Sequence, residues 1–228
     1  MDGTRSASPP GFGARGLAKN RIEALADGIF GVAMTLLVLD VKSPAQLSFE
    51  TTASLLSYLG GLRHSFAMYA ISFVVLGMFW FVHHLQFHFV RHVDRRLLWT
   101  NLAFLMFVAL VPFSTDLYGD HGHLQLPSFV YGANLLVLAL LLYVHLHHLA
   151  GHPDLASEDL GRDATRQMRR QLAMFTVVPT VSIAASFYSP RLSMYLYALL
   201  ALPAFVPGRI DRITRARGDP PSRLTEHP

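Results

Sequence analysis

The sequence contains no cysteine and few charged residues. The absence of cysteine from its 228 residues excludes disulfide bonds and thiolate metal sites. Charged residues make up 15% of the chain, whereas hydrophobic residues make up 52%. Soluble domains of this size rarely combine so few charges with so many apolar side chains, so the composition indicates a membrane protein.

The chain also lacks the common signatures of hydrolases. H-E-x-x-H, G-x-S-x-G and a pair of acids within one apolar segment are all absent, so we expect no enzymatic activity. The segment GFGARG, residues 11–16, has the spacing of a dinucleotide motif but neither a strand before it nor a helix after it. The net charge of +4 is explained by basic cytoplasmic loops, so we expect no nucleic-acid partner.

Apolar segments dominate the chain between two polar tails. A helix needs about 20 apolar residues to cross a bilayer. Six segments reach or approach that length: 21–41, 64–90, 97–118, 127–149, 170–189 and 191–208. They predict an all-α membrane protein with six transmembrane helices in a domain at 17–208. Its flanks, 1–16 and 209–228, are predicted to be cytoplasmic tails, the first of them disordered. No cleavage site follows the first segment, so we expect it to remain as a membrane anchor.

Lysine and arginine are distributed unequally between the two sides of these segments. Of the 19 basic residues, all but Lys42, Arg63 and Arg191 lie on the side of the termini when the chain crosses six times. Basic residues accumulate on the cytoplasmic side of membrane proteins. We therefore predict a multi-pass protein of the cell membrane with both termini in the cytoplasm.

The first segment carries a stripe at helical spacing. Val32, Thr35, Leu36 and Leu39 follow i, i+3, i+4 and i+7 and so share one face. Such a face ordinarily points to lipid or to a neighbouring helix. Alternatively, copies from several subunits would line a pore, where apolar rings form a dewetting constriction and Thr35 offers oxygen to a cation. Periodicity alone leaves both interpretations open.

Asp27 lies about 140° from the centre of that stripe on the same helix. A carboxylate at membrane depth costs at least about 2.5 kcal/mol unless it is paired, so we expect a partner. The candidates at similar depth are Trp80, His83, His84, His88 and Asn101. The sequence does not decide which of them bonds Asp27. A buried aspartate would also suit a secondary transporter, although the two halves of the chain show no internal repeat.

Histidines are concentrated near two segment ends. The clusters are His83, His84, His88 and His145, His147, His148. Imidazoles from two helices would suit a haem, and histidine ligation would suit zinc or copper. Interfacial histidines, some of them bonded to Asp27, explain the same pattern more simply. We therefore expect no metal and no cofactor.

Several segments together match the signature of a known family. RIEALADG, residues 21–28, is similar to R-x-x-x-F-S-D-G, with Leu25 and Ala26 in place of Phe and Ser. Phe79-Trp80 with His83-His84 and the segments beginning at Asn101 and Tyr131 correspond to that family's next three helices. Over residues 17–208 the sequence resembles the transmembrane protein 175 family of potassium-permeable channels, in its prokaryotic single-repeat form.

This resemblance implies a homotetramer in the lipid bilayer, with six helices per subunit and a pore lined by the first helix. It implies potassium as the permeant ion, with a modest preference over sodium, and no small-molecule substrate. The hydrophobic gate falls on Val32, the polar position linked to potassium preference on Thr35, and further pore positions on Leu36 and Leu39.

The resemblance also implies a polar network that holds the first helix against the second and third. It maps onto Arg21, Asp27, Trp80, His83, His84 and Asn101. On an ideal helix Arg21 projects near the stripe, so either the helix begins irregularly or Arg21 lines the inner mouth of the pore. Asp40, near the outer end, either adds a carboxylate ring that concentrates cations or is an ordinary interfacial acid.

Overall fold

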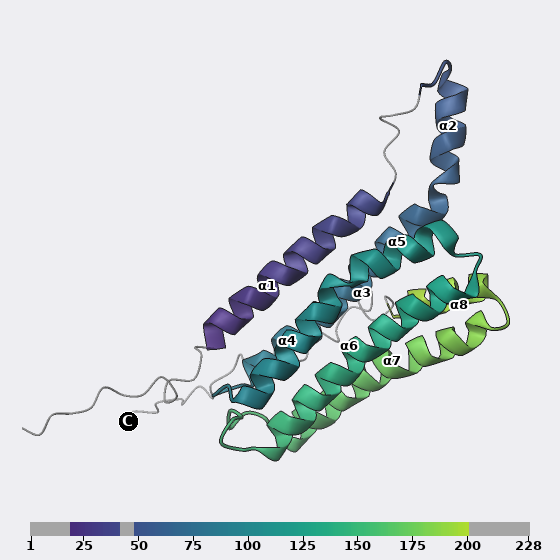
Figure 1. The fold of residues 1–228 in the computed structure, drawn as a ribbon. Helices are drawn as coiled ribbons and strands as arrows, with labels where there is room; N and C mark the ends of the chain where they lie inside the picture. Colours follow the sequence, from purple (N-terminus) through teal and green to yellow (C-terminus); the bar gives the residue numbers. More distant parts are fainter. Residues whose placement is uncertain (1–18, 42–47, 201–228) are drawn as a thin grey trace, which may run out of the picture.

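The computed structural model describes residues 19–41 and 48–200, and the regular elements of this part are all helices (Figure 1). In chain order they are α1 (Lys19–Leu36), a 3₁₀ turn η1 (Leu37–Asp40), α2 (Thr52–Gly61), α3 (Arg63–His88), α4 (Arg95–Ala109), α5 (Val111–His121), α6 (Gln125–Gly151), α7 (Arg162–Ser186) and α8 (Pro190–Ala198). The two predicted tails lie outside the described residues.

The long helices run side by side, and α1 lies at one edge of the bundle (Figure 1). α1 packs on α3, α4 and α5, while α7 and α8 pack on α6 at the opposite edge. One continuous apolar core joins them and includes Phe30 of α1, Phe79 of α3, Phe104 of α4 and Phe175 of α7. α1 is therefore attached to the bundle along one side only.

Within the described residues, four helical stretches are long and apolar enough to cross a membrane. They are Lys19–Leu39, Arg63–His88, Arg95–His121 and Gln125–Gly151, and they confirm the first four predicted spans. The predicted fifth span corresponds to the C-terminal part of α7, whose first turns are strongly basic. The predicted sixth span begins with α8, but its residues beyond 200 are outside the described part. The total of six spans therefore stays a prediction.

The third predicted span consists of two helices rather than one continuous helix. α4 ends at Ala109 and α5 begins at Val111, with Leu110 between them. Pro112 sits in the first turn of α5. Because proline has no backbone N–H, it cannot donate the hydrogen bond that would have continued α4. The break is thus a local consequence of proline within a continuous apolar stretch.

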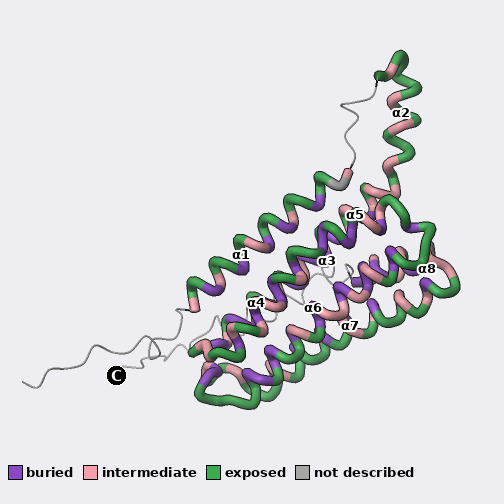
Figure 2. The backbone as a smooth tube through the Cα atoms, in the orientation of Figure 1, coloured by how far each residue is buried: buried purple, intermediate pink, exposed green. Residues whose placement is uncertain are grey.

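α2 lies in the segment between the first two predicted spans, where no helix was predicted. Thr51 and Ser54 form a capping box: the Ser54 N–H donates to the Thr51 hydroxyl at 3.1 Å, and the Thr51 N–H donates to the Ser54 hydroxyl at 3.4 Å. The helix has no buried residue and extends away from the bundle from the start of α3 (Figures 1 and 2).

Asp94 fixes the start of α4 at the end of the bundle nearest the N-terminus of α1. Its carboxylate accepts from the Leu97 N–H at 2.7 Å as a helix cap, and its other oxygen lies 2.8 Å from Nε2 of His148 on α6. Desolvation raises the pKa of Asp94, but these two hydrogen bonds and the charge of His148 outweigh it, so the pKa lies below its ordinary value. Asp94 thereby links the start of α4 to the end of α6.

Candidate functional site

α1 has one buried face and one exposed face. Ile22, Ala26, Phe30, Ala33 and Leu37 repeat every three or four residues, and each is at most 4% exposed. Figure 2 shows buried and exposed bands alternating along α1. The helix forms because this apolar period supplies a packing face for α3 and α4, while its other face has no such partner among residues 19–41 and 48–200.

The predicted stripe lies on the exposed face of α1. Val32 is 58% exposed, Leu36 41% and Leu39 73%, and Thr35 is also exposed. Leu36 ends α1, and Leu39 lies in the 3₁₀ turn η1 that follows it directly. We call these four residues the α1 stripe. The side chains of the stripe are therefore exposed on the surface of the single chain.

Thr35 is held in one orientation by its own helix. Its hydroxyl donates to the carbonyl oxygen of Val32 at 2.8 Å. A hydroxyl that donates its proton inward keeps oxygen lone pairs that can accept a hydrogen bond or coordinate a cation. Thr35 therefore presents the side-chain oxygen of a stripe that is otherwise apolar.

Asp27 is bonded to tryptophan rather than to histidine. The Trp80 Nε1–H on α3 donates to Oδ1 of Asp27 at 2.8 Å. His84, one turn further along α3, stacks on the Trp80 ring with centroids 5.6 Å apart. The pair joins α1 to α3 and is partly open to the surface of the chain.

His83 belongs to a second, buried pair. Its Nε2 lies 2.8 Å from Oδ1 of Asn101 on α4, and its ring stacks on Phe104 with centroids 5.2 Å apart. Phe30 of α1 packs against both rings, at centroid distances of 6.1 Å to His83 and 5.9 Å to Phe104. The predicted network residues thus form two neighbouring groups that both contact α1.

Arg21 and Asp40 are not placed in these groups. Arg21 is exposed near the start of α1 and makes no ion pair or hydrogen bond among residues 19–41 and 48–200. Lys19, rather than Arg21, links the start of α1 to α3. Its Nζ donates to the His88 carbonyl on α3 at 3.4 Å and lies 4.0 Å from Glu23. Asp40 ends η1, and its side chain is outside the described part of the structure.

The second histidine cluster is tied to neighbouring helices. Nδ1 of His145 lies 2.8 Å from Oε1 of Gln86 on α3, and His148 bonds Asp94. His147 stacks on Tyr143, with centroids 6.4 Å apart. Among the described residues, no three histidine or acidic side chains converge as metal ligands would.

Comparison with known proteins decides the family. Residues 21–112 match the family model described as endosomal/lysosomal potassium channel TMEM175. A potassium channel of Streptomyces collinus is 33% identical over 186 residues, which cover 80% of this chain and 89% of that protein. The chain belongs to the TMEM175 family. The matched range contains the α1 stripe and both polar groups described above.

A solved structure supports the same TMEM175 fold. The crystal structure of a lysosomal potassium-selective channel TMEM175 homologue from Chamaesiphon minutus superimposes with a TM-score of 0.70 at 30% identity, covering 81% of this chain and 94% of that one. The chicken TMEM175, named an endosomal/lysosomal proton channel, is 27% identical over 217 residues, but the match covers only 42% of it. The TMEM175 relatives are named as channels, and the protein is not an enzyme.

Trp80→Phe should loosen α1 from this TMEM175-family bundle. The substitution keeps an aromatic ring and removes only the N–H that donates to Asp27. We expect a loss of about 1.5 kcal/mol, the lower end for a hydrogen bond to a charged group, because both side chains are partly exposed. Thermal unfolding of the purified protein in detergent measures the change. Trp99→Phe is the matched control, since Trp99 is 60% exposed; equal losses in the two variants would contradict the assigned bond.

Proposed function

We propose that the protein is an oligomeric cation channel that conducts potassium passively through a pore lined by α1. The observation that carries this proposal is the exposed α1 stripe, which lies opposite a face packed on α3 and α4. The relatives named as potassium channels support the choice of ion. The basic loops support a cell-membrane protein with both termini in the cytoplasm.

Several copies of the chain are needed for such a pore. α1 lies at the edge of the bundle, so one chain contributes one wall (Figure 1). Four copies arranged symmetrically, as the resemblance implies, would place four α1 stripes around an axis. Rings of Val32, Leu36 and Leu39 would then form an apolar constriction that excludes water from a narrow pore.

Flux measurements test the channel proposal. Purified protein in liposomes should pass potassium down its gradient without ATP or a second ion, and native mass measurement should give a tetramer. Flux that saturates and requires a co-ion would favour a secondary transporter instead. The pairing of Asp27 with Trp80 argues against that alternative, because it assigns the carboxylate to joining two helices.

Thr35→Val should lower the preference for potassium over sodium. The substitution preserves shape and removes the oxygen that the stripe offers to a cation. Loss of one such ligand contributes about 0.5–1.5 kcal/mol, so we expect the permeability ratio to fall about twofold to tenfold. Reversal potentials under bi-ionic conditions give the ratio.

Thr180→Val is the matched control for this experiment. Thr180 is also exposed, on α7, and its hydroxyl donates to its own helix at 2.8 Å through the Thr176 carbonyl. The control should leave the ratio unchanged. A Thr35 variant with the wild-type ratio would remove this residue from the permeation path.

A further inference from the structure

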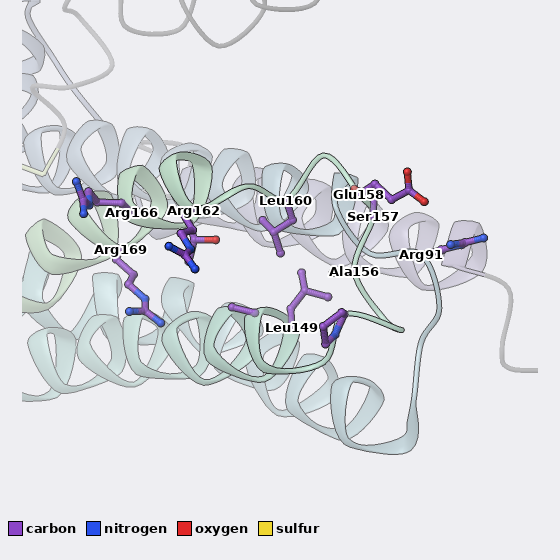
Figure 3. A pocket seen from close by; sticks show the side chains of 12 residues that line it. Arg91, Leu149, Ala156, Ser157, Glu158, Leu160, Arg162, Arg166 and Arg169 are labelled. Atoms are coloured by element: carbon purple, nitrogen blue, oxygen red, sulfur yellow. The ribbon is translucent and has the colours of Figure 1, made fainter.

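A pocket of about 660 Å³ lies where the loop after α6 meets the start of α7 (Figure 3). The buried side chains of Leu149 and Ala156 and the half-buried side chain of Leu160 give it an apolar floor. Four arginines from two parts of the chain line it: Arg91, Arg162, Arg166 and Arg169. It is an apolar cavity with a cationic rim, and it has no part in the α1 stripe.

The loop that forms one wall of the pocket is fixed to the end of α3. The Arg91 N–H donates to the Leu155 carbonyl at 2.7 Å, and the Ser157 N–H donates to the Phe89 carbonyl at 2.8 Å. Val90 and Ala156 form a short antiparallel bridge between these bonds. The pocket therefore has a defined shape rather than being a gap beside a loose loop.

Among the residues that line the pocket, the four arginines outnumber one acidic residue, Glu158. None of the four arginines makes an ion pair within the described part of the chain. Glu158 is the acidic residue of the lining, and Figure 3 shows its carboxylate pointing away from Arg162 and Arg169, which extend from α7 toward α6. The N-terminus of α7 has no side-chain cap at Gly161 and carries Asp163 in its first turn.

We propose that this pocket binds the phosphate headgroup of an anionic phospholipid. Guanidinium groups match phosphate oxygens in pairs, which accounts for arginine on the rim. The pocket lies beside the end of the α6 span, at the depth where headgroups begin. A soluble phosphate compound needs no apolar floor, whereas the glycerol and upper acyl carbons of a lipid would cover Leu149 and Leu160. The proposal goes beyond ion conduction.

Lipid binding by the purified full-length protein in a neutral detergent tests the proposal. Phosphatidylglycerol is titrated against the wild type and against the triple variant Arg162→Gln, Arg166→Gln, Arg169→Gln, and bound lipid is counted by native mass spectrometry. Because three attractive charges are lost together, the triple variant should bind phosphatidylglycerol on the order of a hundredfold more weakly. Phosphatidylcholine should bind poorly to both proteins.

A second triple variant controls for charge. Arg95→Gln, Arg96→Gln and Arg170→Gln remove the same number of exposed arginines nearby but outside the pocket. It should bind phosphatidylglycerol as the wild type does. Equal weakening in both triple variants, or none in the first, would overturn the proposal. Thermal stabilisation of the wild type by pyrophosphate alone, equal to that by phosphatidylglycerol, would also overturn it, because the pocket would then be a site for soluble anions. None of these measurements depends on ion flux, so the channel proposal can fail or stand separately.

Discussion

Leu36→Asn and Leu39→Asn should each raise the potassium conductance of the reconstituted protein. An apolar ring in a narrow pore resists wetting, and an ion must cross it without most of its water. Exchanging a leucine for an amide removes about 1.5 kcal/mol or more of apolar contribution, which corresponds to roughly tenfold in rate. Single-channel recording in planar bilayers measures the effect, and open-channel current should rise without any added stimulus.

The control for these variants is Leu140→Asn on α6. Leu140 is 47% exposed, comparable to the 41% of Leu36, but it lies outside α1. It introduces the same polar group at an exposed position of a span and should leave conductance unchanged. Wild-type currents in the Leu36 and Leu39 variants would show that the α1 stripe faces acyl chains.

The exposed face of α1 was predictable because both of its faces follow one helical period. The spacing that groups Val32, Leu36 and Leu39 leaves Phe30 and Ala33 to the other side, and the structure buries those two. The first four spans were predictable for a similar reason, since length and composition alone identify them. These inferences need no knowledge of which helix lies beside which.

The partner of Asp27 could not be predicted in this way. Three candidates lie within about one turn of α3 and share one side of it: Trp80, His83 and His84. The helical period therefore does not distinguish between them as partners of Asp27. The choice depends on how α3 is rotated against α1, which the core around Phe30 sets. Trp80 consequently reaches Asp27, while His83 turns inward to Asn101.

Local signals for the remaining differences were present but weak. Pro112 marks the break between α4 and α5, yet proline is also tolerated within membrane helices, as Pro179 is within α7. The capping box at Thr51 has Ser54 where glutamate or glutamine is usual, so the start of α2 is hard to recognise. In each case the sequence contained the cause, but several outcomes were compatible with it.

Gly132→Ala should strongly destabilise the packing of α6 against α7 and α8. A Cβ at this position of α6 would lie 2.6 Å from Cγ1 of Ile183 on α7 and would collide with the hydroxyl of Tyr197 on α8. That hydroxyl donates to the Ser128 carbonyl at 2.9 Å, so displacing it also breaks a buried hydrogen bond. Overpacking and the lost bond together should cost about 3 kcal/mol, measured by thermal unfolding in detergent.

Gly77→Ala separates this steric effect from a general effect of alanine in a membrane helix. Gly77 also lies inside a span, on α3, but its Cβ would meet only the terminal methyl of Met34 at 3.7 Å, an ordinary contact. Replacing glycine by alanine within a helix otherwise stabilises it by roughly 1 kcal/mol, so Gly77→Ala should unfold at the same or a higher temperature than the wild type. The two variants should therefore shift in opposite directions. A Gly132 variant as stable as the wild type would mean that α7 and α8 do not pack against α6 at this glycine.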